Sequence, residues 1–114
     1  MKARLPQGYG KQNVNELMKQ AQQMQEQMQQ KQAELEETEY SATAAGGMVA
    51  VTMRGDYQVT GVKIKPEVVE PDDVEMLEDM VAAAVNEAVR TVKESAEAEL
   101  GQISGEFNLP GLGL

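Results

Sequence analysis

Residues 38–64 read TEYSATAAGGMVAVTMRGDYQVTGVKI, and this stretch decides the fold. Apolar and polar residues alternate along it in three short runs. The runs are separated by Gly46-Gly47 and by Gly55-Asp56, which are pairs typical of tight hairpin turns. Alternation with a period of two is the pattern of a strand with one buried face. The stretch therefore predicts a three-stranded antiparallel meander.

The third run breaks the alternation once. Val59 and Val62 are three residues apart, so they would fall on opposite faces of a regular strand. A β-bulge at Thr60-Gly61 absorbs the extra residue and returns both side chains to one face. We expect the apolar face of the sheet to join two copies of the chain. The residues expected at that interface are Val49, Val51, Met53, Val59, Val62 and Ile64.

A long helix is predicted before the sheet. Asn13 and Glu16 have the spacing of a capping box, and apolar residues then recur every three or four positions as far as about Glu37. This narrow stripe suits one partner helix rather than a broad core. Residues 1–12, which contain glycine and proline, are expected to form a flexible basic arm. The stripe consists of Val14, Leu17, Ala21, Met24, Met28 and Leu35, with Lys31 in its one gap.

A second long helix is predicted after the sheet. The third strand ends at a proline, and Asp72 and Glu75 then form another capping box. Apolar residues with helical spacing follow, and Gly101 is the expected stop. Residues 103–114 are expected to form a loose tail, which leaves residues 13–102 as a single domain. The expected class is α+β, with a long helix, a three-stranded antiparallel sheet and a long helix.

The lengths of these elements indicate a dimer. At 1.5 Å per residue the two helices would be roughly 36 and 42 Å long. A compact domain of this size has a radius of gyration of about 13 Å, so the helix ends would project beyond the sheet. The sheet also has two open edges, which are templates for pairing. We therefore expect a two-fold homodimer joined through the sheets, with the helices projecting like arms.

The composition argues against an enzyme. The chain has neither His nor Cys, so the usual general bases, thiol nucleophiles and transition-metal ligands are missing. The acidic residues from Asp72 to Asp79 leave a Mg²⁺ or Ca²⁺ site open, but they also suit the positive end of a helix dipole. We expect no cofactor. Neither a signal peptide nor a membrane span is visible, so the expected location is the cytoplasm.

Charge is distributed unevenly along the chain, whose net charge is −9. Residues 1–33 carry five basic and two acidic residues, a balance of +3, whereas the remainder carries five basic and 17 acidic residues, a balance of −12. Lys11 and Lys19, with Lys2 and Arg4 on the arm, could follow a phosphate backbone. If the two helices pair antiparallel across the short sheet, Arg90 and Lys93 would lie near the N-terminal half of the first helix. The competing interpretation is ordinary solubilising charge, and charge alone favours the latter.

Several short motifs follow one another in an informative order. They are Leu-Met-Lys-Gln-Ala-Gln at 17–22, Gly-Gly-Met-Val-Ala-Val-Thr-Met at 46–53, Val-Lys-Ile-x-Pro at 62–66, Met-Leu-Glu-Asp-Met-Val-Ala-Ala-Ala-Val-Asn-Glu-Ala at 76–88, and Leu-Pro-Gly at 109–111. In order and spacing they resemble the YbaB/EbfC family of bacterial nucleoid-associated proteins. The resemblance implies tweezer-shaped homodimers that bind duplex DNA, alter its conformation, and influence nucleoid organisation and gene expression.

By this resemblance, DNA contacts fall on the helical arms, at Lys19 within the matched motif and more loosely at Lys11, Arg90 and Lys93. Members of the family often have more Lys in the first helix, where this chain has Gln and Glu26. A dimer of net charge −18, twice −9, should repel duplex DNA except at local basic patches. Binding is therefore expected to be weak and strongly dependent on salt. The expected location is the nucleoid, with no membrane as a partner. The alternative is a protein-interaction module whose arms grip a protein partner, for example one of replication or recombination.

Overall fold

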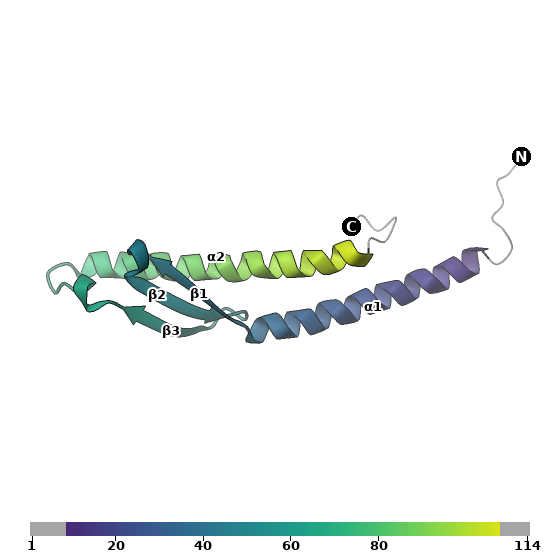
Figure 1. The fold of residues 1–114 in the computed structure, drawn as a ribbon, viewed down its shortest axis with the longest axis horizontal. Coiled ribbons are helices and arrows are strands. Elements are labelled where there is room, and N and C mark those ends of the chain that lie inside the picture. Colours follow the sequence, from purple (N-terminus) through teal and green to yellow (C-terminus); the bar gives the residue numbers. More distant parts are fainter. Residues whose placement is uncertain (1–8, 108–114) are drawn as a thin grey trace, which may run out of the picture.

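The computed structural model describes residues 9–107, with side chains from residue 13 to residue 106. Two long helices flank a small sheet, one before it and one after it in the chain (Figure 1). This arrangement confirms the α+β class and the predicted order of elements. The main elements are α1 (Tyr9–Glu37), β1 (Glu39–Ala44), β2 (Val49–Arg54), β3 (Val59–Ile64) and α2 (Val74–Phe107).

The strands form one antiparallel sheet in the order β1-β2-β3, as the alternation predicts. The register breaks once, because Thr52 pairs with Gly61 whereas the next residue, Met53, pairs with Val59. Thr60 is therefore the extra residue of a β-bulge, which confirms that prediction. The bulge brings the apolar residues of β3 onto the face that carries the apolar residues of β2.

Both turns of the sheet are wider than predicted. All three residues of Ala45–Gly47, which forms a short 3-10 turn, have positive φ angles (54°, 66° and 90°). Glycine adopts such angles without strain, so the two glycines serve this wider turn, and the predicted two-residue turn is wrong. In the second turn Tyr57 has a φ of 67°, which an extended strand does not allow. β3 therefore begins at Val59 rather than at Tyr57.

Both helices begin at residues other than those predicted. α1 begins at Tyr9, so residues 9–12 belong to the helix rather than to the predicted arm. α2 begins at Val74, and Asp73 rather than Asp72 caps it. The Oδ1 atom of Asp73 accepts a 3.1 Å hydrogen bond from the backbone N–H of Met76, which has no partner within the first turn of the helix.

α2 also continues through Gly101, the predicted stop, to Phe107. A glycine inside a helix costs only about 1 kcal/mol relative to alanine. Burial of Ile103, which is 7% exposed and lies against α1, offsets that cost. The first part of the predicted tail is therefore helical, and its remainder, residues 108–114, lies outside the described residues, as do residues 1–8 of the arm.

The core lies between α2 and one face of β1 and β2 (Figure 1). The side chains that α2 contributes are small, so the helix can approach the sheet closely and leave little empty space. The hydroxyl of Ser95 donates a 3.2 Å hydrogen bond to the hydroxyl of Tyr40, which ties α2 to β1. The buried residues of this cluster are Ala42, Val49, Val51, Met53, Ala84, Ala88 and Val92.

The molecule is elongated. α1 lies antiparallel beside the C-terminal half of α2, and the first half of α1 projects past the end of α2 (Figure 1). The principal extents are 83 × 28 × 16 Å and the radius of gyration is 23.0 Å. A compact domain of this length would have a radius of gyration of about 13 Å. The projection predicted from the element lengths is therefore confirmed.

Gly55 makes the junction between α1 and the sheet possible. Its backbone N–H donates a 3.0 Å hydrogen bond to the carbonyl oxygen of Thr38. A Cβ atom at this position would lie 1.7 Å from the carbonyl oxygen of Leu35. The absence of a side chain therefore lets the turn after β2 pack directly on the end of α1.

Candidate functional site

The apolar face of β3 is only partly covered. β3 is an edge strand, and α2 lies over β1 and β2 instead. Val62 pairs with Val51 of β2, so the apolar side chains of β3 continue the surface of the core. Val59, Val62 and Ile64 are nevertheless 46%, 44% and 37% exposed. This strip beside α2 can accommodate a further apolar element.

The six residues predicted at the dimer interface divide into two groups. Val49, Val51 and Met53 are at most 2% exposed and pack against α2 of their own chain. For these three the predicted interface position is wrong, because a side chain enclosed in the core of one chain cannot contact a second. The other three, on β3, are exposed and remain available to a partner.

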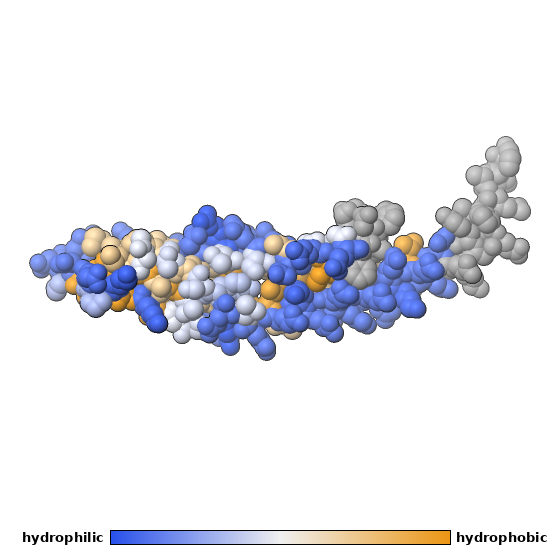
Figure 2. Space-filling model, viewed as in Figure 1, coloured by the Kyte–Doolittle hydropathy of each residue, from blue (hydrophilic) through white to orange (hydrophobic). Residues whose placement is uncertain are grey.

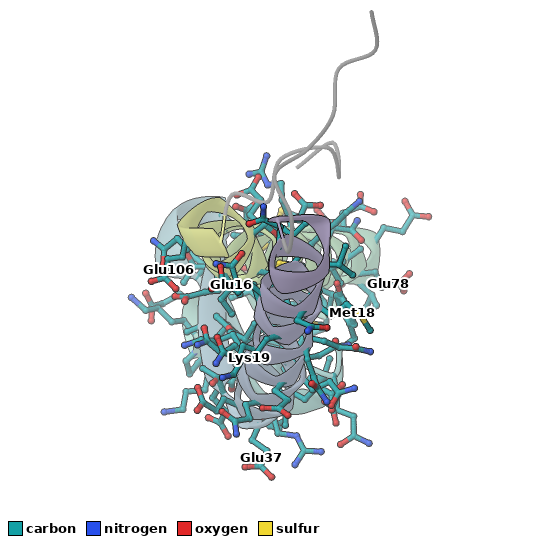
Figure 3. All side chains as sticks on the ribbon, turned by 90° about the vertical axis from the view of Figure 1, so that its right-hand side faces the viewer. Glu16, Met18, Lys19, Glu37, Glu78 and Glu106 are labelled. Atoms are coloured by element: carbon teal, nitrogen blue, oxygen red, sulfur yellow. The ribbon has the colours of Figure 1, made fainter. Side chains whose placement is uncertain are left out.

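The four cations predicted to contact DNA lie on both helices. Lys11 falls in the first turns of α1, and its side chain lies outside the described residues. Lys19 is exposed on the projecting half of α1, on a different side of the helix from Met18 (Figure 3). Lys93 and Arg90 are exposed on α2.

Arg90 is bound to a neighbouring carboxylate. Its Nη2 atom lies 2.7 Å from both carboxylate oxygens of Glu87. The hydrogen bond to Glu87, followed by the charges of Glu87 and Glu94, raises the pKa of Arg90 above its ordinary value. The guanidinium therefore keeps its charge, but Glu87 balances that charge locally and weakens its attraction for phosphate.

The packing of the helices holds the predicted cations apart. Ile103 of α2 lies among α1 residues between Gln27 and Glu34, so α2 faces the C-terminal half of α1. Lys93 follows Val92, which packs in the core against the sheet, whereas Lys19 lies nearer the N-terminus of α1 than the residues around Ile103. The expectation that Arg90 and Lys93 lie near the N-terminal half of α1 is therefore wrong. The reason is that α1 is joined directly to β1, which displaces it along α2.

Two cations on the sheet were not among the predicted contacts. Lys63 lies between two apolar residues of β3 and so projects from the face opposite the core. Lys65 follows in extended backbone, two residues further on, and both lysines are exposed. Neither forms an ion pair with another described residue, and the same holds for Lys19 and Lys93. The alternation that predicts the buried face was the signal that could have identified Lys63.

The outer face of the sheet, opposite α2, carries mostly small side chains, so another molecule can approach it closely. At one end of it Arg54 is paired with Asp56 at 3.0 Å, and at the other end lie the unpaired Lys63 and Lys65. Hydroxyl and ammonium groups donate hydrogen bonds to phosphate oxygens, so this face can accept a nucleic-acid backbone. The residues between the two ends are small, namely Ser41, Thr43, Ala50, Thr52 and Gly61.

Other kinds of site find no support in the part of the chain that the structure describes. No three His, Cys, Asp or Glu residues within it are grouped so as to hold a metal ion. The acidic run from Asp72 to Asp79 instead contains the cap of α2 at Asp73. Neither described helix is both long and apolar enough to cross a membrane.

Known proteins are similar to this chain in sequence and in fold. A model of the YbaB/EbfC DNA-binding family matches residues 10–107. A relative from Clostridium botulinum, named a nucleoid-associated protein, is 50% identical over 110 residues, which are 96% of each chain. A relative of the same name from Lachnoclostridium phytofermentans is 52% identical over 102 residues, 89% of this chain and 86% of that one. The crystal structure of the uncharacterized protein HP0035 from Helicobacter pylori has a TM-score of 0.60 and 19% identity, and the match covers 73% of this chain and 87% of that chain. The chain belongs to the YbaB/EbfC DNA-binding family.

Proposed function

We propose that the protein is a homodimer that binds duplex DNA in the nucleoid, alters its conformation, and thereby affects nucleoid organisation and gene expression. The observation that carries this proposal is the family match over residues 10–107. The relatives' shared name, nucleoid-associated protein, supports the same function. The alternative, a module that grips a protein partner, is less favoured because neither the family description nor the relatives' names point to one.

The proposed dimer forms through β3. An antiparallel pairing of β3 with its copy would satisfy the unpaired backbone groups of both edges and give a six-stranded sheet. The half-exposed Val59, Val62 and Ile64 of both chains would then lie side by side. Burial of apolar side chains from both copies supplies the driving force.

The proposed contacts with DNA combine the sheet and the arms. Pairing through β3 would bring Lys63 and Lys65 of both copies to the middle of one continuous sheet face. The two lysines of each copy form a local basic patch on that face, which attracts an anion even though the dimer as a whole has a net charge of −18, twice −9. Lys11 and Lys19 on the arms would extend the contact along the duplex. Contacts with phosphates position a duplex without reading its sequence, so little sequence preference is expected.

A test of the dimer uses two exposed valines. Val62→Lys places a charge on the open strip of β3, whereas Val69→Lys places the same charge on a residue that is 52% exposed and lies after the strand. Burying an unpaired charge costs several kcal/mol, so Val62→Lys should weaken the dimer more than about a hundredfold. Sedimentation across a range of protein concentrations measures the effect. Dimers of equal strength in both variants would refute pairing through β3.

A test of DNA binding uses the salt dependence of the affinity for a random-sequence duplex. The double variant Lys63→Gln/Lys65→Gln removes four charges from a dimer, so the slope of log K against log salt should fall by about 3 to 4. Lys31→Gln is the control, because Lys31 already lies 3.4 Å from Glu34 and 3.7 Å from Glu99. An unchanged slope in the double variant would exclude the sheet as a contact surface, and no binding of any variant at low salt would refute DNA binding.

A further inference from the structure

The apolar stripe of α1 is covered along only part of its length. Met24, Met28 and Leu35 are half-buried where α1 lies beside α2. Towards the N-terminus the stripe continues through Val14 and Leu17, which are 52% and 42% exposed. Figure 2 shows an apolar patch on the projecting part of α1, surrounded by hydrophilic residues. Val14 and Leu17 therefore form an uncovered apolar face on the projecting half of α1.

The residues on either side of this uncovered face are uncharged. Its neighbours at helical spacing are Asn13, Met18 and Gln20. The two charged residues of this stretch, Glu16 and Lys19, lie on a different side of α1 from Met18 (Figure 3). A charged partner therefore finds no opposite charge beside the face, whereas a second copy of the chain meets no like charge there. The amides of Asn13 and Gln20 each contain a donor and an acceptor, so they can also hydrogen-bond to the same amides of a copy.

The uncovered face has the spacing to pair with itself. An antiparallel arrangement that sets Val14 opposite Leu17 of a second copy also sets Leu17 opposite Val14 of that copy. The two helices then overlap from their first residue to about residue 22, a length of roughly 21 Å. α2 ends level with about residue 26 of α1, because Ile103 lies among residues 27 to 34 and the helix ends one turn later. The second copy of α1 therefore fits on the stripe without displacing α2.

We propose that the projecting half of α1 is a contact between two copies of the chain, in which the uncovered faces pack antiparallel about a two-fold axis. The overlap is only about 21 Å long and about 10 Å wide, which is smaller than a stable interface, so the contact is weak and dissociates on dilution. It requires neither DNA nor pairing through β3.

Together with the proposed dimer, this contact gives a linear assembly. Antiparallel pairing of β3 with its copy points the two projecting helices in opposite directions. Helices that meet through their uncovered faces then belong to different dimers. Because each dimer offers one such face at either end, alternation of the two contacts joins dimers into a chain. The chain of dimers rests on the proposed function, whereas the contact between the helices does not.

Mixing two single-cysteine variants tests the antiparallel pairing, because the chain has no cysteine of its own. Val14→Cys and Leu17→Cys chains, one of them labelled with a heavy isotope, are mixed in equal amounts without DNA and oxidised mildly. Only cysteines that face each other closely can join, so the mixed disulfide should exceed the two symmetric disulfides together by at least about threefold. Random collision gives equal amounts. The control mixture replaces Val14→Cys with Asn15→Cys, which lies on the opposite face of α1 from Leu17 and should show no such excess.

Sedimentation over a range of protein concentrations is the second measurement. It is made in the Val62→Lys background, where pairing through β3 is weakened and the contact between the helices can be measured alone. Leu17→Lys places a charge in the centre of the contact and should weaken the association by at least about tenfold. Asn15→Lys adds the same charge on the opposite face of α1 and should leave the association unchanged.

Four results would overturn the proposal. An excess of symmetric disulfides would mean that the helices pair in parallel, and equal amounts of mixed and symmetric disulfides, or none at all, would mean that they do not pair in a fixed register. Equal association of the Leu17→Lys and Asn15→Lys variants would exclude the uncovered face as the contact. Failure of the Val62→Lys chain to associate at any concentration would do the same. None of these measurements uses DNA, so each result leaves the test of DNA binding separate.

Discussion

Replacing Gly55 with Ala should destabilise the protein although it adds only one methyl group. The new Cβ atom would lie 1.7 Å from the carbonyl oxygen and 2.5 Å from the carbonyl carbon of Leu35, and 3.0 Å from the Cα atom of Glu36. All three are backbone atoms, so no change of rotamer relieves the overlap. The turn after β2 and the end of α1 must instead move apart by more than about 1 Å, which loosens the close packing between them.

The magnitude follows from what this movement breaks. Inserting an extra methylene into a packed site costs typically about 1–3 kcal/mol. The 3.0 Å hydrogen bond from the Gly55 N–H to the Thr38 carbonyl would lengthen as well, which adds about 1 kcal/mol. We therefore expect the free energy of unfolding to fall by about 2–4 kcal/mol. The loss should be concentrated where α1 meets the sheet.

Urea unfolding followed by circular dichroism measures this change. All variants are compared at one protein concentration, because the apparent stability of the proposed dimer would depend on it. Gly101→Ala is the matched control, since a Cβ atom there meets nothing within 4 Å and the residue lies inside α2. That variant should be more stable than the parent by about 0.5–1 kcal/mol, because alanine favours helix over glycine. If Gly55→Ala unfolded within about 0.5 kcal/mol of the parent, the reasoning about the junction of α1 and the sheet would be wrong.

Three smaller changes test the rest of the fold, each by the same unfolding measurement. Asp73→Ala should cost about 1 kcal/mol because it removes the cap of α2, whereas Asp72→Ala should leave stability nearly unchanged; equal effects would contradict the capping. Ala84→Leu should cost about 1–3 kcal/mol because Ala84 is 0% exposed between α2 and the sheet, and the exposed Ala83→Leu should not. Tyr40→Phe should cost about 0.5–1.5 kcal/mol, because it removes the hydroxyl that accepts a hydrogen bond from Ser95 of α2. An unchanged urea midpoint would show that this hydrogen bond does not stabilise the protein.

The order of elements and the bulge in β3 were predictable because both follow from local sequence periodicity. A step of three between Val59 and Val62 cannot be accommodated in a regular strand that keeps both on one face, and the register shows Thr60 as the extra residue. The helical spacing of apolar residues likewise predicted α1 and α2, because each helix is stabilised by burial of one apolar face.

The ends of the helices were less predictable, because competing residues stood close together. Asp72 and Asp73 are both good caps, and only the geometry of the chain after the sheet places Asp73 over the N–H of Met76. Gly101 is a reasonable helix stop by sequence, but the contact of Ile103 with α1 carries α2 past it. The cost of a glycine inside a helix is only about 1 kcal/mol, and burial of one apolar side chain is enough to offset it.

The candidate site depended still more on tertiary structure. Alternation identifies an apolar face of the sheet, but it does not say which strands the chain's own helix covers. The structure places α2 over β1 and β2, which encloses Val49, Val51 and Met53 and leaves the apolar residues of β3 exposed. The structure also shows that Lys19 and Lys93 lie far apart along the two helices. The sequence could not predict this separation, because the connection between two antiparallel helices sets how far one is shifted along the other.

By itself, the sequence determined the α+β class, the element order, the register break and the family, because each is written in spacings of a few residues or in the order of short motifs. Only the tertiary structure decided which apolar side chains are enclosed within one chain and which remain available to a partner. The physical reason is that periodicity specifies the direction in which a side chain points. Burial depends instead on which distant element lies there, and α2 is wide enough to cover only part of the sheet.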